Sequence, residues 1–310
     1  MFRLRKCLAV PVRTAPIRPR IGYVPIRPAA ESAVFGPVID EAALDALELC
    51  YRDNGFVVLR GIFEPGLTDA MELECVAAQQ QVIGHELPQR YGSTVFLDDE
   101  AKAERFANYV EFVNELSPAV RDAAAHPVLL TVLRRLLGED CWLRDSNQFG
   151  IVYQDARPGR ESGYSRIGWH SDWQAGPSLD VWPSTAFTFH IDGTSPANGF
   201  LRVVPGSHQW ATPAPFKNVN NVEVPADAKP VGGYTATPPP FEMPMRFEPV
   251  PGEIPIYAER GDVILHDCYL WHSAARATEE SSTRRHVRGG YFGGDRAGES
   301  AEQFLKNAAR

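Results

Sequence analysis

Three groups of residues have types and spacing suited to metal chemistry. His170 and Asp172 are separated by one residue, and His272 follows about a hundred residues later. Two histidines and one carboxylate form a ligand set that holds a non-haem Fe(II) ion and leaves coordination positions open. Arg284 and Arg285 come shortly after His272, and a planar guanidinium suits the carboxylate of a co-substrate. These residues predict an iron site with a carboxylate-binding arginine beside it.

The spacing of the His-x-Asp pair favours a β-strand. On a strand, residues i and i+2 point to the same face with Cα atoms about 6.6 Å apart, so both side chains reach one ion. Ser171 then points away, and the flanking Trp169 and Trp173 favour a partly enclosed mouth. The pair alone is a weak signal, because it also occurs on surface strands with polar alternation. Its weight depends on the second histidine.

The distal histidine follows a predicted turn and strand. Gly261-Asp262 is typical of a turn, and Val263–Leu265 is typical of a buried strand. His272 lies just beyond that strand, on a strand end or loop. His266 is the competing candidate for the ligand, and it also suits a core histidine or a group behind the ligands.

A further motif lies between the two halves of the ligand set. The segment Asn198–His208 has the pattern N-G-x-L-x-V-x-P-G-S-H, and Gly261–His272 has the pattern G-D-x-x-x-x-D-C-x-x-x-H. In this order, and followed by arginine, the motifs resemble those of the phytanoyl-CoA dioxygenase family, and within it those of ectoine hydroxylases. The resemblance runs from about Tyr51 to Phe292. It implies an Fe(II)- and 2-oxoglutarate-dependent oxygenase on a double-stranded β-helix, a jelly-roll of the cupin type. His170, Asp172 and His272 match the iron ligands of the family.

The resemblance also suggests residues that contact the co-substrate. Thr283 occupies the position of the arginine that binds 2-oxoglutarate in the family. A one-residue insertion in the loop before it would place Arg284 at that position, and Arg285 is the alternative. Gln148 resembles a glutamine near the co-substrate in ectoine-hydroxylase-like sequences, and Thr185 offers a hydroxyl. Both also suit ordinary strand positions.

The reaction implied by the resemblance is hydroxylation of a C–H bond in a small soluble molecule. It consumes O2 and 2-oxoglutarate, releases succinate and CO2, and uses ascorbate as a reductant in vitro. Asp172 excludes the halogenating subtype, which replaces this carboxylate with a small residue. One alternative is a non-redox cupin-like metalloenzyme that uses zinc or manganese on the same ligands. The other is a binding protein of the same fold that has lost its metal.

Composition limits the other classes of function. The chain has 310 residues, 44% of them hydrophobic, which suits a single large domain with a sizeable core. A net charge of −8 argues against nucleic acid as a partner, and the sequence has no apolar run long enough for a membrane span. The five scattered cysteines predict reduced thiols and a cytoplasmic location. The oligomeric state has no signal in the sequence.

The chain divides into an arm and a domain. Residues 1–30 contain seven basic residues, five prolines and no acid, which predicts a flexible arm over residues 1–35, with organelle targeting as a minor alternative. Residues 36–310 are expected to form one oxygenase domain, which is helical over about 40–139 and has a β-helix core over about 140–295. Residues 209–258 are rich in Pro, Asn and Gly and predict a lid over the metal.

Caps and apolar periodicity predict the elements of the domain. Helices are expected from Asp40 to Asp53, after Thr68, and from Pro118 and from Pro127. Alternating or continuous apolar runs predict strands at Phe56–Leu59, Trp142–Tyr153, Ile167–Trp173, Thr185–Asp192, Phe200–Val204, Asp262–Leu265 and Val287–Phe292. Many separated strands with turn signals favour a jelly-roll.

Overall fold

The computed structural model describes residues 30–92, 95–99, 104–145, 150–156, 168–175, 184–213, 218–219, 222–223, 231–244, 246–279 and 281–293. The basic residues 1–29 and the candidate Gln148 lie outside this set. Residues 30–35, which the sequence assigned to a flexible arm, instead form the 3-10 helix η1 (Ala30–Ala33) and the strand β1 (Val34–Phe35). Ala33 is fully buried, so the domain begins earlier than expected.

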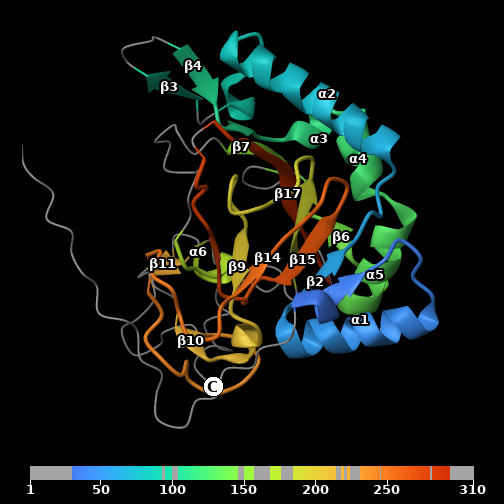
Figure 1. The fold of residues 1–310 in the computed structure, drawn as a ribbon, viewed down its shortest axis with the longest axis vertical. Helices are drawn as coiled ribbons and strands as arrows, with labels where there is room; N and C mark the ends of the chain where they lie inside the picture. Colours follow the sequence, from blue (N-terminus) through green and yellow to red (C-terminus); the bar gives the residue numbers. More distant parts are fainter. Residues whose placement is uncertain are drawn as a thin grey trace, which may run out of the picture.

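Two facing β-sheets form the centre of the protein (Figure 1). The larger has eight strands, in the order β1, β2 (Phe56–Leu59), β15 (Val263–Asp267), β8 (Ser184–His190), β17 (Arg284–Phe292), β7 (Val152–Ala156) and β5 (Tyr109–Val110), with β6 (Trp142–Leu143) pairing with β17. The pairing of β1 with β2 is parallel, and the other pairings in this sheet are antiparallel. The smaller sheet has the order β14 (Ile254–Ile256), β9 (Leu201–Val203) and β16 (His272–Ala274).

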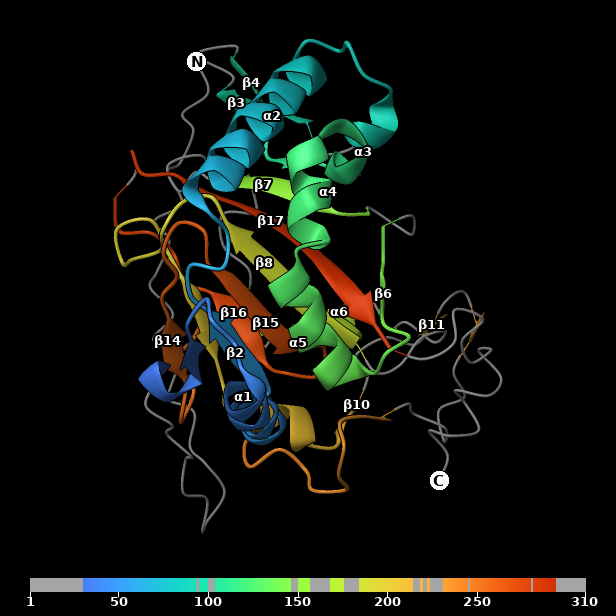
Figure 2. The ribbon, with the colours of Figure 1, turned by 90° about the vertical axis from the view of Figure 1, so that its right-hand side faces the viewer.

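Helices cover one face of the larger sheet (Figure 2). They are α1 (Glu41–Asn54), α2 (Pro65–Ile83), α3 (Val113–Leu116), α4 (Pro118–Ala124) and α5 (Pro127–Leu137). Their apolar faces pack with the alternate residues of the strands that point toward them, including Phe187, Phe189 and Leu265. Because a strand alternates its faces, the remaining residues of the same strands point to the smaller sheet and are available to line the site.

The space between the two sheets has its own apolar core. Phe56, Val58 and Ile264 from the larger sheet pack with Val203 and Ile256 from the smaller one. Two sheets joined face to face by such a layer are the arrangement of a jelly-roll, as the sequence predicted.

The helical predictions agree with the structure apart from small shifts in the boundaries. The Asp40 carboxylate accepts a hydrogen bond from the Ala43 amide at 2.9 Å, and Gly55 ends α1 with a φ of 81°. Both features were visible in the sequence, because caps depend on neighbouring residues alone. Helix α2 begins at Pro65, ahead of the expected start after Thr68. Proline at the first turn suits this position, because its missing N–H has no partner there in any helix.

The strand predictions contain two errors. The stretch Trp142–Tyr153 is not one strand, because β6 ends at Leu143 and β7 begins at Val152. The predicted strand Ile167–Trp173 is also wrong: Asp172 begins a short helix, α6 (Asp172–Ala175). Strands β15 and β17 are longer than expected, which places His266 and Arg284 on regular strand.

Short elements make up the rest of the described chain. They are two 3-10 helices and three pairs of strands: η2 (Gln89–Tyr91), η3 (Ser207–Gln209), β3 (Val95–Asp99) with β4 (Glu104–Ala107), β10 (Thr212–Pro213) with β13 (Val231–Gly232), and β11 (Asn218–Val219) with β12 (Val222–Glu223). In the described part of the chain, no helix has both the length and the apolar character needed to cross a bilayer.

The predicted lid is too long at its C-terminal end. Strand β14 lies inside the segment 209–258 and pairs with β9 in the smaller sheet. Phe241 and Val250 are buried against Trp169 and Trp271, which directly precede His170 and His272 in the sequence. The C-terminal part of the segment is therefore packed structure. A lid remains a prediction only for the earlier residues, and hydrogen exchange with and without ligands would test it.

Candidate metal centre

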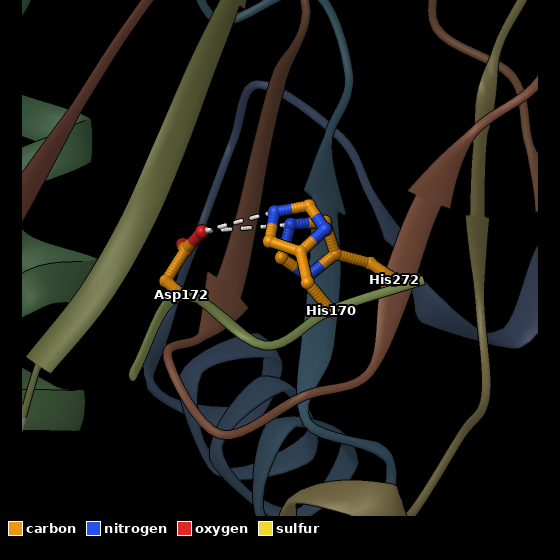
Figure 3. A group of neighbouring side chains, drawn as sticks. All are labelled: His170, Asp172 and His272. Carbon is orange, nitrogen blue, oxygen red and sulfur yellow. Dashed lines mark ion pairs between the residues drawn. The ribbon is translucent and has the colours of Figure 1, made fainter. Parts of the chain in front are cut away.

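Three side chains point toward one another, two from the segment at the start of α6 and one from β16 (Figure 3). His170, Asp172 and His272 each place a possible ligand atom within 4.8 Å of the other two. Asp172 Oδ1 lies 3.8 Å from His170 Nε2 and 3.5 Å from His272 Nε2. The described residues contain no other such group of three. The structure thus brings together the three residues that the sequence selected as iron ligands.

Backbone pairing sets the two histidines side by side. His170 and His272 exchange both backbone hydrogen bonds, with N···O distances of 3.0 and 2.9 Å, and their ring centroids lie 4.3 Å apart. This bridge joins the segment before α6 to strand β16. Asp172 reaches the same point because the chain turns into α6, where the Trp173 amide donates to the Cys268 carbonyl at 3.0 Å. The convergence therefore comes from a turn and not from the alternation of a strand.

The hydrogen bonds of both rings leave the ligand nitrogens available. His170 Nδ1 lies 2.8 Å from the Gly168 carbonyl, and His272 Nδ1 lies 2.9 Å from the Leu270 carbonyl. A carbonyl can only accept, so Nδ1 carries the proton in each ring and Nε2 keeps its lone pair. Bonds of this kind fix the tautomer and orientation of metal-binding histidines. Both rings therefore present Nε2 toward Asp172.

The charge states of the three residues suit a cation. Burial, with the charge of a neighbouring histidine, lowers the pKa of both His170 and His272 to about 4, so each ring is neutral at pH 7. Burial acts to raise the pKa of Asp172, but the imidazoles of His272, His266 and His170 more than offset it and hold the pKa below its usual value. Two neutral imidazoles and one carboxylate match the donor set for Fe(II).

The competing histidine lies at the edge of this group. His266 is buried on β15, and its ring centroid lies 4.4 Å from that of His272. Its Nε2 lies 3.9 Å from Asp172 Oδ2, whereas His170 and His272 approach the other carboxylate oxygen, Oδ1. His266 is therefore adjacent to the centre but outside the group of three mutually close ligand atoms.

The two arginines on β17 have opposite surroundings. Arg285 points toward the helices, where Nε and Nη2 donate to Asp192 at 2.8 Å each and Nη1 lies 2.7 Å from Glu72 Oε1. Arg284 is 5% exposed and points to the opposite face. Its Nε has no hydrogen-bond partner, and none of the described carboxylates forms an ion pair with it. Burial lowers the pKa of Arg284 to about 10, which leaves it charged at neutral pH.

A buried cation without an anion is unfavourable unless a ligand supplies the charge. The unpaired Arg284 therefore fits the far carboxylate of 2-oxoglutarate, and the three-residue group fits Fe(II). This fit rests on the donor set and on the orphaned guanidinium of the protein itself.

Gly199 forms part of the cradle for Arg284, which sequence reasoning did not identify. It has a φ of 87°, and a Cβ built on it would lie 2.6 Å from Arg284 Nη1 and 2.6 Å from the Ala275 carbonyl oxygen. The Asn198-Gly199 pair was the available signal, since it predicted a turn. Only the structure shows that the absent side chain makes room for a guanidinium.

Gly199→Ala is expected to displace the guanidinium and to strain the backbone. We expect a loss of about 1–3 kcal/mol in the free energy of unfolding, because L side chains disfavour this φ. We also expect weaker binding of 2-oxoglutarate, measured by titration of the metal-loaded protein. Gly61→Ala is the matched control, because Gly61 also has a positive φ but no atom within 4 Å of its Cβ position. Equal 2-oxoglutarate affinity in both variants would contradict the cradle.

Thr185 does not join the centre. Its side chain lies on the helix-facing side of β8, where Oγ1 accepts a hydrogen bond from the Tyr51 hydroxyl at 2.6 Å and donates to the His266 carbonyl at 2.9 Å. These bonds tie α1 to β15, so Thr185 stabilises the strand that carries His266. A contact of Thr185 with the co-substrate has no support from this placement.

Trp169 is buried next to the metal group and does not line the entrance to it that the sequence had suggested. It is 1% exposed, its amide donates to the Arg246 carbonyl and its indole Nε1 donates to the Glu248 carbonyl, both at 2.8 Å. The guanidinium of Arg202 lies over its ring. Because Trp169 directly precedes His170, these contacts fix the position of the backbone at His170.

Comparison with known proteins shows the family and the fold of the chain. The sequence model of the phytanoyl-CoA dioxygenase family, described as Phytanoyl-CoA dioxygenase (PhyH), matches residues 51–287. An ectoine dioxygenase of Nocardia farcinica is 28% identical over 209 residues, which are 66% of this chain. The matched region spans only 60% of the length of that relative.

Solved structures of low identity share the fold. The epimerase SnoN in complex with Fe3+, alpha ketoglutarate and nogalamycin RO has a TM-score of 0.55 at 17% identity, covering 82% of this chain and 85% of its own. EctD from S. alaskensis with bound Fe has a TM-score of 0.56 at 18% identity, covering 89% and 83%. The jelly-roll predicted from the sequence is thereby confirmed. With a match over most of its length, the chain belongs to the phytanoyl-CoA dioxygenase family.

Proposed function

We propose that the protein is an Fe(II)- and 2-oxoglutarate-dependent dioxygenase that hydroxylates a C–H bond of a small soluble molecule. The observation that carries this proposal is the buried, unpaired Arg284 on the same sandwich as the three-residue metal group. A metal site alone also suits a zinc or manganese enzyme. A buried cation without a carboxylate partner beside the metal group favours an acidic co-substrate such as 2-oxoglutarate.

The residues have separate roles in this reaction. His170 and His272 would bind iron through Nε2, and Asp172 through a carboxylate oxygen, which leaves the remaining positions for reactants. Arg284 would hold the far carboxylate of the co-substrate through paired hydrogen bonds. When bound, iron and 2-oxoglutarate supply the activation of O2, with succinate and CO2 as the products of the co-substrate. The buried tryptophans Trp169 and Trp271 exclude water behind the ligands.

The relatives support chemistry that depends on iron and 2-oxoglutarate, and hydroxylation of the substrate is part of the proposal. The curated relative acts, by its name, on ectoine, which makes ectoine a first compound to assay. Structures with this fold include an epimerase and a carbocyclase as well as EctD. Hydroxylation is proposed here because Asp172 occupies the carboxylate position, and product analysis by mass spectrometry would detect an added oxygen. Gln148 near the co-substrate, a cytoplasmic location and the absence of nucleic-acid and membrane partners stay predictions.

Removal of the metal is expected to abolish 2-oxoglutarate turnover. Chelation should stop succinate release, and Fe(II) with ascorbate should restore it, because the reaction needs a redox-active ion. Zinc or nickel should bind the same ligands and inhibit, since affinities for such sites overlap widely among divalent metals. The measurement is succinate released per chain with each metal. Full activity with zinc alone would favour the non-redox metalloenzyme, and binding without any turnover would favour a binding protein.

A further inference from the structure

The inner face of the larger sheet carries more positive charge than the co-substrate requires. Alternate residues of β17, namely Arg284, His286 and Arg288, point to this face, and His190 of β8 lies directly across from His286. Burial lowers the pKa of His190 to about 4 and that of His286 well below its usual range, with the charge of Arg284 adding to both shifts. The imidazoles are therefore neutral, and the two guanidiniums are the cations of this wall.

Arg288 lies close to the metal group. It pairs with Thr188 on β8, and two residues further along β17 Gly290 pairs with Ala186, which in turn pairs with His266 on β15. Gly290, Ala186 and His266 are therefore neighbours across three strands, and Arg288 lies two residues before Gly290 on the same face of β17. After burial and the neighbouring imidazoles, its charge also lowers the pKa of Asp172 and of His170, which agrees with this proximity.

Arg288 has no anionic partner among the residues that the structure describes. Its Nε is buried without a hydrogen bond, and its guanidinium carbon lies 5.0 Å from the centre of the Tyr109 ring. Two other arginines of the sheets have such partners: Arg202 on β9 is paired with Glu253, and Arg285 on β17 is paired with Asp192. A carboxylate thus holds each of these two arginines, and no described carboxylate holds Arg288.

The charges at the metal site indicate that the co-substrate does not need Arg288 as a counter-ion. A divalent metal with Asp172, a 2-oxoglutarate dianion and Arg284 together carry no net charge, so Arg288 remains as an uncompensated cation. A ring stacked on one face of a guanidinium leaves its edge N–H groups available, and these match the two oxygens of a carboxylate. One guanidinium balances a carboxylate but not a phosphate dianion.

We propose that Arg288 binds a carboxylate of the primary substrate and so holds the substrate beside the metal. This inference rests on the proposed function, because it assumes that Arg284 is occupied by 2-oxoglutarate. It assigns the substrate to the small carboxylic acids, including amino acids, and excludes neutral alcohols and amines without an acid group.

The test compares matched acids and amides on the full-length protein. Protein loaded with Mn(II) and 2-oxoglutarate is titrated with phenylacetate and phenylacetamide, and with hexanoate and hexanamide, and the rise in melting temperature gives the affinity. We expect the acids to bind at least tenfold more tightly than their amides. Arg288→Gln should remove that preference, and Arg288→Lys should keep part of it, since it retains charge without the planar fork. Arg52→Gln is the control, because Arg52 is a largely exposed arginine on α1.

Three results would overturn the inference. They are equal binding of acids and amides, an unchanged preference in Arg288→Gln, and a loss of 2-oxoglutarate affinity in Arg288→Gln as large as that in Arg284→Ala. The last would place Arg288 in the co-substrate site. The wild-type comparison of acids with amides is decisive even if Arg288→Gln does not fold. Failure of 2-oxoglutarate to bind the wild-type protein counts instead against the proposed function.

Discussion

His272→Ala is expected to reduce bound iron from about one ion per chain to nearly none, whereas His266→Ala should retain most of it. His272 is one of the three proposed ligands, and its Nε2 lies 3.5 Å from Asp172 Oδ1 while its Nδ1 lies 2.9 Å from the Leu270 carbonyl. Loss of that ligand leaves two donors, which is too few for a stable non-haem site. His266 approaches only the other carboxylate oxygen, at 3.9 Å.

The two variants control for each other, because both remove a buried imidazole from neighbouring segments of the same region. The measurement is iron per chain after reconstitution with Fe(II) without oxygen, alongside the thermal stability of each variant. If His266→Ala empties the site and His272→Ala does not, the ligand assignment is wrong. A moderate fall in affinity for His266→Ala would agree with a group behind the ligands, where losses of about 10- to 100-fold are common.

Arg284→Ala and Arg285→Ala are expected to have opposite effects. Arg284→Ala should weaken 2-oxoglutarate binding by about 2–3 kcal/mol, roughly 30- to 150-fold, because a charged, paired hydrogen bond to a buried carboxylate is lost. It should leave the folded protein at least as stable, since it removes a buried cation that has no described partner.

Arg285→Ala should leave 2-oxoglutarate affinity within a few fold of the wild type and lower stability. It removes the partner of Asp192 and Glu72 at a half-buried position, for which a loss of about 1–2 kcal/mol is reasonable. Titration of the metal-loaded protein with 2-oxoglutarate and urea unfolding measure the two effects. A larger loss of 2-oxoglutarate affinity in Arg285→Ala would move the anchor by one residue.

The sequence by itself determined the elements whose causes are local. The helix α1 was predicted with nearly its observed bounds, because helix capping and apolar periodicity depend on residues within a few positions. The candidate ligand set was also readable, since His170, Asp172 and His272 match a set of two histidines and one carboxylate by residue type and motif order alone. The motifs identified the family of the chain, but they did not show how the three side chains come together.

Tertiary structure decided what depends on pairing between distant segments. Alternation along β17 shows that Arg284 and Arg285 face opposite ways, but only the register with β8 and β7 shows which one points inward. Distant segments also cause the helix that begins at Asp172. The chain turns there because His170 pairs with His272 and the Trp173 amide donates a hydrogen bond to the Cys268 carbonyl. Strand β14 was missed inside a Pro-rich stretch, because its pairing with β9 compensates for weak local propensity. Residues far apart in the chain supply these contacts, so no local pattern contains them.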